Sequence, residues 1–279
     1  MDKLLPRHPA LAFWVMSIIA LLLYSGIYIL HPFSTGVNEF FLNVVYLAAV
    51  TSPAVIASAV QKEYDSADTP MRIWKCFAYG FWSWSLAELI WVIYRSIMGE
   101  VPLVNLSAPF YLVGYVLMTL AVTSQYVQTR HQGSLSERAI VMIVWITMLL
   151  VSMLLFFVTV LVPSANLSLA DYVGGYLNIL YGVGDMTLAI TAVLMVVLFQ
   201  GGALGRPWWG FITLAVADAF YGWLIQTGAH AYETLGGNLL RLTSDLIYMC
   251  SYLMIAYSFL RQYVLLRFGP SERFLGKAR

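Results

Sequence analysis

The stretch Arg206–Tyr263 contains WWGFITLAVADAFYGWLIQTG from Trp208 and LLRLTSDLIYMCSYLMIAYSFLRQY from Leu239, two long apolar segments that each carry an aspartate. About 20 mostly apolar residues are enough to cross a lipid bilayer as an α-helix. A carboxylate at the centre of such a helix costs about 2.5 to 3.5 kcal/mol, so Asp218 and Asp245 need partners or water. The two segments therefore predict membrane-spanning helices with a polar interior.

The whole chain has the composition of a membrane protein. Hydrophobic residues make up 61% of its 279 residues and charged residues 10%, whereas soluble domains contain about 25% charged residues. Apolar segments of spanning length follow one another with short loops between them. The sequence predicts an all-α polytopic membrane protein with eight transmembrane helices, at residues 10–30, 40–60, 72–98, 108–129, 138–162, 175–199, 207–227 and 239–264.

The second half of the chain repeats features of the first. At shifts of 130 to 137 residues the matching pairs are Asn43 and Asn178, Tyr46 and Tyr181, Glu88 and Asp218, Tyr111 and Tyr248, and Tyr115 and Tyr252. Such self-similarity indicates an internal duplication. Because each unit crosses the membrane an even number of times, the units are expected to be parallel. The prediction is two parallel four-helix repeats, residues 1–134 and 135–266, followed by a short cytoplasmic tail, 267–279.

Basic residues predict the orientation in the membrane. Of the 15 Lys and Arg residues, all except Arg95 and Arg241 fall on one side of the eight-span arrangement. Basic loops stay in the cytoplasm, so we expect both termini to be cytoplasmic. The first and fifth spans have no ionisable residue in their interiors, and we expect them to face lipid all round.

Four carboxyl groups lie within the predicted spans, between mid-depth and the outer surface. Residues three, four or seven positions apart share a helix face, which places aromatic rings beside these acids. An acidic cavity with an aromatic lining, open to the outer side, suits a cationic or amphiphilic ligand. The predicted ligand-binding residues are Asp185, Asp218, Asp245, Glu88, Tyr181, Tyr248, Tyr252, Tyr111, Tyr115, Trp91 and Arg241.

The same residues also fit a purely structural network. Arg241 lies four residues before Asp245, and Arg95 lies seven residues after Glu88, so two acids could be neutralised by local ion pairs. Tyrosine hydroxyls could satisfy the other acids. A path for ions or protons is a third interpretation of this polar interior.

Several cofactor chemistries do not fit the sequence. No lysine lies deep in the final span to anchor a retinal Schiff base, and the four histidines lie at span ends or in loops, which argues against haem within the bilayer. Cys76 and Cys250 lie in different spans and form no metal motif. No phosphate-binding loop and no basic stripe for nucleic acid is present. We expect no metal site and no nucleic-acid partner.

The acid and aromatic pattern resembles the polytopic sensory domains attached to bacterial GGDEF and EAL signalling proteins. Those domains often have a Trp-rich helix with an acid, then a Pro-Ser loop and a Tyr-Leu-x-Gly-Tyr helix. The resemblance covers most of residues 72–263 and implies a sensor of a small molecule or lipid in a bacterial or archaeal cytoplasmic membrane. The matching residues are Glu88, Trp91, Pro102, Ser107, Tyr111 and Tyr115 in the first half, and Asp218, Tyr221, Asp245, Tyr248 and Tyr252 in the second.

Two further functions are compatible with this sequence. The chain is also similar to the lysoplasmalogenase family of eight-span membrane hydrolases, and that similarity implies Glu88 and Asp218 as an acid/base pair acting on a lipid. The third interpretation is an accessory subunit of a larger membrane complex, with partner subunits against the first and fifth spans. Among the three, we expect binding or sensing rather than catalysis.

Overall fold

The described part of the chain consists of helices joined by short turns and loops. The structure, a computed structural model, describes residues 9–98, 104–129, 168–199, 206–229 and 238–269 and some positions between 142 and 155. These residues contain no β-strand, as predicted for an all-α protein. The long helices are α1 (Pro9–Leu30), α2 (Thr35–Gln61), α3 (Thr69–Met98), α4 (Ser107–Thr129), α6 (Leu169–Phe199), α7 (Arg206–Gln226) and α8 (Leu239–Phe268).

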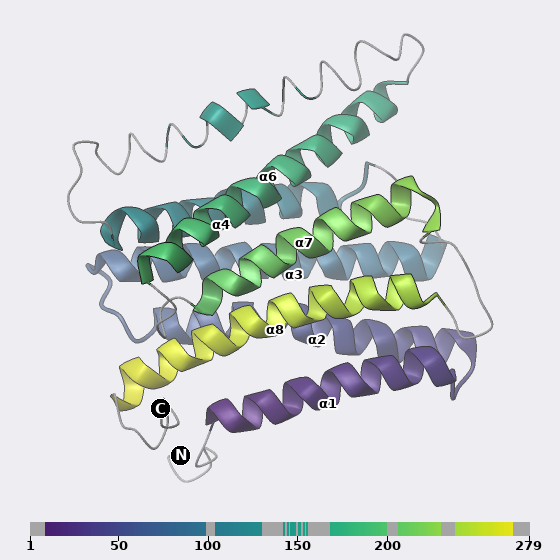
Figure 1. Ribbon diagram of the computed structural model, residues 1–279, viewed down its shortest axis with the longest axis horizontal. Helices are drawn as coiled ribbons and strands as arrows, with labels where there is room; N and C mark the ends of the chain where they lie inside the picture. The colour runs from purple at the N-terminus through teal and green to yellow at the C-terminus, as the bar shows by residue number, and fades with distance from the viewer. Residues whose placement is uncertain are drawn as a thin grey trace.

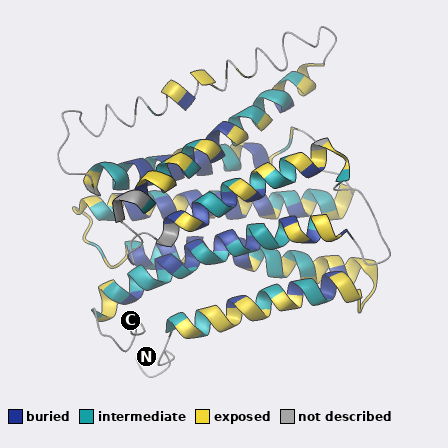
Figure 2. Cartoon of the chain, in the orientation of Figure 1, coloured by how far each residue is buried: buried dark blue, intermediate teal, exposed yellow. Residues whose placement is uncertain are grey.

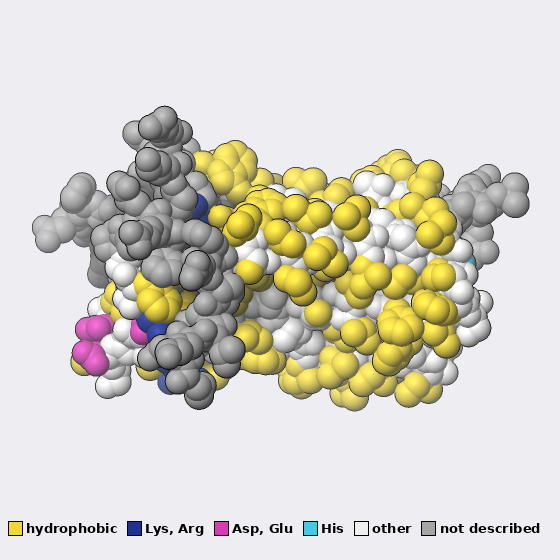
Figure 3. All heavy atoms as spheres, turned by 90° about the horizontal axis from the view of Figure 1, so that it is seen from below, with side chains coloured by type: hydrophobic (Ala, Val, Ile, Leu, Met, Phe, Trp, Pro, Cys, Tyr) yellow, Lys and Arg dark blue, Asp and Glu magenta, His cyan; other side chains and the backbone are white. Residues whose placement is uncertain are grey.

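All seven of these helices are long and apolar enough to cross a membrane. They coincide with seven of the eight predicted spans to within about two helical turns at each end. The other predicted span, 138–162, lies largely outside the described residues. Figure 3 shows hydrophobic side chains over most of the visible surface and charged side chains gathered at one end. This distribution is the one expected of an integral membrane protein.

Six helices form a closed ring. Along this ring α2 packs against α3, α3 against α4, α4 against α6, α6 against α7, α7 against α8, and α8 against α2. Helix α1 lies outside the ring and packs against α2 and α8 (Figure 1). Buried positions gather on the inward faces of the ring helices, whereas α1 is largely exposed (Figure 2).

Helix α1 does not face lipid all round, contrary to the expectation from its sequence. It buries Tyr24, Ile27 and Tyr28 on the face that contacts α2 and α8. The Tyr28 hydroxyl donates to the carbonyl oxygen of Asn238 at 3.0 Å. Tyrosines have an apolar ring and a polar tip, so they can join an apolar helix to a polar interior.

Aromatic side chains pack together inside the ring of helices. Phe77 and Phe81 of α3 meet Phe211 of α7 and Phe259 of α8, with centroid separations of 5.3 to 6.1 Å. Each of these rings is at most 2% exposed. Because α3 and α7 are not neighbours in the ring of helices, these contacts cross its centre. Glu88 and Asp218 lie seven residues beyond Phe81 and Phe211, nearer the end of the bundle where α3 and α7 finish.

Close contacts between helices depend on small residues. A Cβ atom at Gly210 of α7 would lie 2.4 Å from Cγ1 of Ile255 on α8. A side chain there would force the two helices apart. Small residues at contact points let membrane helices approach closely, which increases van der Waals attraction between them.

Candidate functional site

The four predicted carboxyl groups lie on four different helices. Glu88 is on α3, Asp185 on α6, Asp218 on α7 and Asp245 on α8. Glu88 is 9% exposed and Asp185 is 7% exposed, so both are shielded from the surroundings. Glu88 interacts electrostatically with Asp218 and Asp245. The fold therefore brings each acid within electrostatic range of at least one other acid, although each belongs to a different segment of the chain.

Each carboxyl group is hydrogen-bonded to a tyrosine on another helix. The Tyr115 hydroxyl donates to Oδ1 of Asp185 at 2.5 Å, and the Tyr24 hydroxyl donates to Oδ2 of Asp245 at 2.8 Å. Neutral donors of this kind stabilise a buried carboxyl group without bringing a positive charge. The two remaining pairs are Tyr248 with Asp218 and Tyr111 with Glu88.

Asp185 and Asp218 lie close enough to interact across the contact between α6 and α7. A hydrogen bond between two carboxyl groups needs a proton on one of them, because a carboxylate has no hydrogen to donate. Two buried acids this close cannot both ionise without a large repulsion. This pair is therefore a place where a proton or another cation is needed.

Aromatic rings surround the acid pair. Tyr181 stacks on Tyr115 with a centroid separation of 6.0 Å, and Trp84 meets the same tyrosine edge-on at 4.9 Å. Tyr252 is 2% exposed and interacts electrostatically with both Asp185 and Asp218. The electron-rich faces of such rings attract cations.

No basic side chain forms an ion pair with these acids in the part of the chain that the structure describes. The ion pair found there joins Arg267 to Glu63 at 3.2 Å, where α8 and α2 end. Arg95 lies over the ring of Trp91, 5.2 Å from its centroid, and within electrostatic range of Asp245. The contact partners of the four acids are thus tyrosines rather than the arginines considered from sequence.

The predicted site residues fall into two groups. The inner group combines three acids with tyrosines of α4, α6 and α8. The outer group lies near the start of α8 and the end of α3 and consists of Asp245, Arg241 and Trp91 with its neighbour Arg95. The inner group consists of Glu88, Asp185, Asp218, Tyr111, Tyr115, Tyr181, Tyr248 and Tyr252.

The predicted ligand-binding residues left out three residues of this region. Tyr24 is on the first span, which was interpreted as having no ionisable residue in its interior, although its spacing of four from Tyr28 would have placed both on one face. Tyr46 of α2 interacts electrostatically with Glu88, and its match to Tyr181 in the repeat could have identified it. Trp84 shares a helix face with Glu88, which the spacing of four residues indicates from the sequence, but it was not predicted to bind the ligand.

Removing the Tyr24 hydroxyl should weaken the attachment of α1 to the ring. Tyr24→Phe deprives Asp245 of its hydrogen-bond donor, and an unsatisfied buried acceptor costs about 1–3 kcal/mol. We expect a lower melting temperature for the full chain in detergent. Tyr79→Phe is the control, because Tyr79 is 52% exposed. Equal melting temperatures for the two variants would contradict this role of Tyr24.

Comparisons with known proteins give no relative for this chain: no family model, no curated protein and no solved structure matches it. The resemblances to sensory domains and to lysoplasmalogenases therefore stay predictions. The function has to be argued from the geometry of the site.

Proposed function

We propose that this integral membrane protein binds a small cationic or amphiphilic molecule among the acids and tyrosines inside the helix ring. The observation that carries the proposal is the close approach of two buried acids, Asp185 and Asp218, each held by a tyrosine hydroxyl. In the described part of the chain these acids have tyrosine partners and no ion pair. A buried, uncompensated carboxylate is costly, so a bound cation would stabilise the ionised pair.

The aromatic environment supports a cation with apolar substituents. Tyr115 and Tyr181 stack beside the acid pair, and Trp84 and Tyr252 add further rings. Quaternary ammonium groups bind to such clusters because the rings attract the charge while their carbon surface contacts the alkyl groups. A strongly hydrated metal ion fits this region less well, and the described residues contain no group of three or more metal-ligating side chains.

The order of helices around the ring supports the proposed pair of parallel repeats. When α2, α3 and α4 are matched in order with α6, α7 and α8, every helix contact in the ring has a counterpart. The contact α2–α3 matches α6–α7, α3–α4 matches α7–α8, and α4–α6 matches α8–α2. Within this pairing, Asp185 corresponds to Val50 and Asp245 to Ala108. Acids in one repeat only are consistent with a one-sided binding site, which we place toward the outer side with both termini in the cytoplasm.

Binding can be tested on the full chain purified in detergent. Choline, tetramethylammonium and spermidine are suitable probes, because they differ in alkylation and in charge. A ligand at about 100 times its dissociation constant stabilises the folded state by about 2.7 kcal/mol. We expect at least one probe to raise the melting temperature more than sodium chloride does at matched ionic strength. Identical effects of all four salts would overturn the proposal.

Hydrolysis of a lipid is a second candidate function, and the electrostatic interaction of Glu88 with Asp218 favours it. Two acids that share one proton can supply both the acid and the base that activate a water molecule. The resemblance to lysoplasmalogenases implies Glu88 and Asp218, and Glu88 does interact electrostatically with Asp218. The purified protein should then release fatty aldehyde from a lysophospholipid with a vinyl-ether chain. No release, or release unchanged in Asp218→Asn, would exclude this function.

A further inference from the structure

A small cavity lies between α3 and α4, near the end of the molecule where α3 begins. Its volume is about 130 Å³. The cavity is separate from the acid on α3, because Glu88 lies 12 residues beyond Cys76, the last α3 residue that lines the cavity. At 1.5 Å per residue this corresponds to about 18 Å along the helix. The lining residues are Thr69, Arg72, Ile73, Cys76, Leu120, Ala121 and Ser124.

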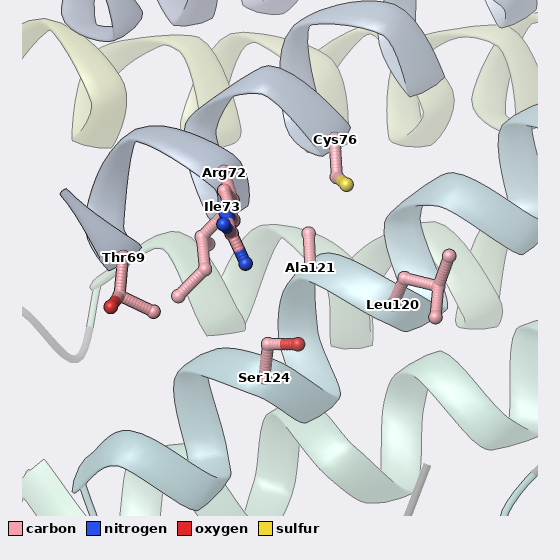
Figure 4. A pocket seen from close by; sticks show the side chains of 7 residues that line it. All are labelled: Thr69, Arg72, Ile73, Cys76, Leu120, Ala121 and Ser124. Atoms are coloured by element: carbon pink, nitrogen blue, oxygen red, sulfur yellow. The ribbon is translucent and has the colours of Figure 1, made fainter. Parts of the chain in front are cut away.

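The cavity combines a positive charge with a serine hydroxyl group. Figure 4 shows the guanidinium group of Arg72 directed from α3 toward α4, with Ser124 on the opposite wall, whereas Thr69 turns its methyl group rather than its oxygen toward Arg72. Arg72 forms no ion pair with any residue in the described part of the chain. The ion pair found there joins Arg267 to Glu63. The same part of the chain offers no hydrogen-bond partner to the hydroxyls of Thr69 and Ser124.

The chemistry of this lining fits a phosphate group. A guanidinium group forms charge-assisted, often bidentate, hydrogen bonds to phosphate oxygens. Thr69 begins α3, so the cavity also lies beside the positive end of a helix dipole. The apolar wall of Ile73, Leu120 and Ala121 can contact the hydrocarbon of a molecule that carries the phosphate.

We propose that this cavity binds the phosphate of an anionic lipid headgroup at the membrane surface. It lies near the end of the bundle where Glu63 and Arg267 pair, which is the side predicted to be cytoplasmic. Basic pockets between transmembrane helices on that side are suited to anionic headgroups. Lys62 and Lys75 are exposed near the same end, as are Glu63, Asp65 and Asp68, so the positive charge that lines the cavity is that of Arg72. Free phosphate has the same polar chemistry but lacks the hydrocarbon that the apolar wall would contact.

The two cysteines provide a direct reporter of occupancy. Cys76 lines the cavity, and Cys250 is on α8. In the full chain carrying Cys250→Ser, a small methanethiosulfonate reagent can react only with Cys76. A headgroup in the cavity should slow this reaction. We expect slower labelling in nanodiscs of phosphatidylglycerol than in nanodiscs of phosphatidylcholine, whose headgroup has no net charge.

Arg72→Gln and Lys75→Gln distinguish a site from a general surface charge, since each removes one positive charge from the same helix. Loss of a charged hydrogen bond of about 1.5–3 kcal/mol corresponds to an affinity about 10-fold to 100-fold weaker. Arg72→Gln should therefore abolish the protection of Cys76 by phosphatidylglycerol, whereas Lys75→Gln should retain it. The melting temperature of each variant with and without phosphatidylglycerol gives a second readout of the same loss.

A parallel arm with inorganic phosphate in detergent identifies the source of the phosphate. Protection of Cys76 by phosphatidylglycerol alone supports the lipid. Protection by inorganic phosphate as well, lost in Arg72→Gln, supports the phosphate site but identifies free phosphate as an occupant. Equal protection in both lipids, or equal loss in Lys75→Gln and Arg72→Gln, overturns the proposal.

Discussion

Gly114→Ala should be strongly destabilising, because the new Cβ atom has no space. It would lie 2.0 Å from Cδ1 and 2.3 Å from Nε1 of Trp84. The indole cannot move away easily, since it is 3% exposed and its Nε1 donates to the carbonyl oxygen of Tyr111 at 3.0 Å. Overpacking of a rigid core costs about 1–3 kcal/mol and sometimes more. We expect a loss at the upper end of this range.

Thermal unfolding of the full chain in detergent measures this loss. Gly222→Ala is the matched control, because a Cβ atom at that helical glycine meets nothing within 4 Å. Alanine favours the helix over glycine by about 1 kcal/mol, so the control should be neutral or slightly stabilising. A melting temperature of Gly114→Ala equal to that of the control would show that α3 and α4 are not packed as described.

The contact at Gly114 also positions the candidate site. Trp84 packs edge-on against Tyr115, whose hydroxyl binds Asp185. On the other side of that tyrosine, a Cβ atom at Gly184 would lie 2.7 Å from Cδ1 of its ring. Two glycines on neighbouring helices thus leave room for one indole and one phenol ring. The orientation of the Asp185 partner depends on close packing as much as on its hydrogen bond.

The sequence was sufficient to predict the seven long helices of the described chain and the acids within them. Apolar segments of spanning length identify each described helix, because hydropathy depends only on local composition. The carboxyl groups of Glu88 and Asp218 could be recognised as candidate site residues because charged side chains are rare inside membrane spans. Counting residues from the start of each span then predicted that all four acids lie between mid-depth and the outer surface.

The specific pairs could not be predicted from the sequence. Asp218 accepts a hydrogen bond from Tyr248 and interacts with Asp185 on α6, and Glu88 lies within electrostatic range. Which acid touches which depends on the order of helices around the ring and on the rotation of each helix about its axis. Adjacent residues on a helix point about 100° apart, so a small rotation changes the contact. Tyr24 was missed because its partner, Asp245, lies 221 residues away in the chain.

Asp218→Asn and Asp185→Asn should each greatly weaken the binding of a cation while preserving the fold. Asparagine keeps the shape of the side chain, and its amide can donate to the facing carboxylate in place of the shared proton. The fold should therefore remain stable. The negative charge that would attract the cation is reduced, and the loss of a charged interaction of about 1.5–3 kcal/mol corresponds to an affinity about 10-fold to 100-fold weaker.

The measurement is the dissociation constant of the best ammonium probe for each purified variant, obtained from melting temperature against probe concentration. The double variant should not lose the sum of the two single effects, because residues in direct contact are coupled. Glu63→Gln is the control, since Glu63 is an acid paired with Arg267 where α2 ends. Wild-type affinity in both single variants would mean that the carboxyl pair holds the helices together and that the cation binds elsewhere.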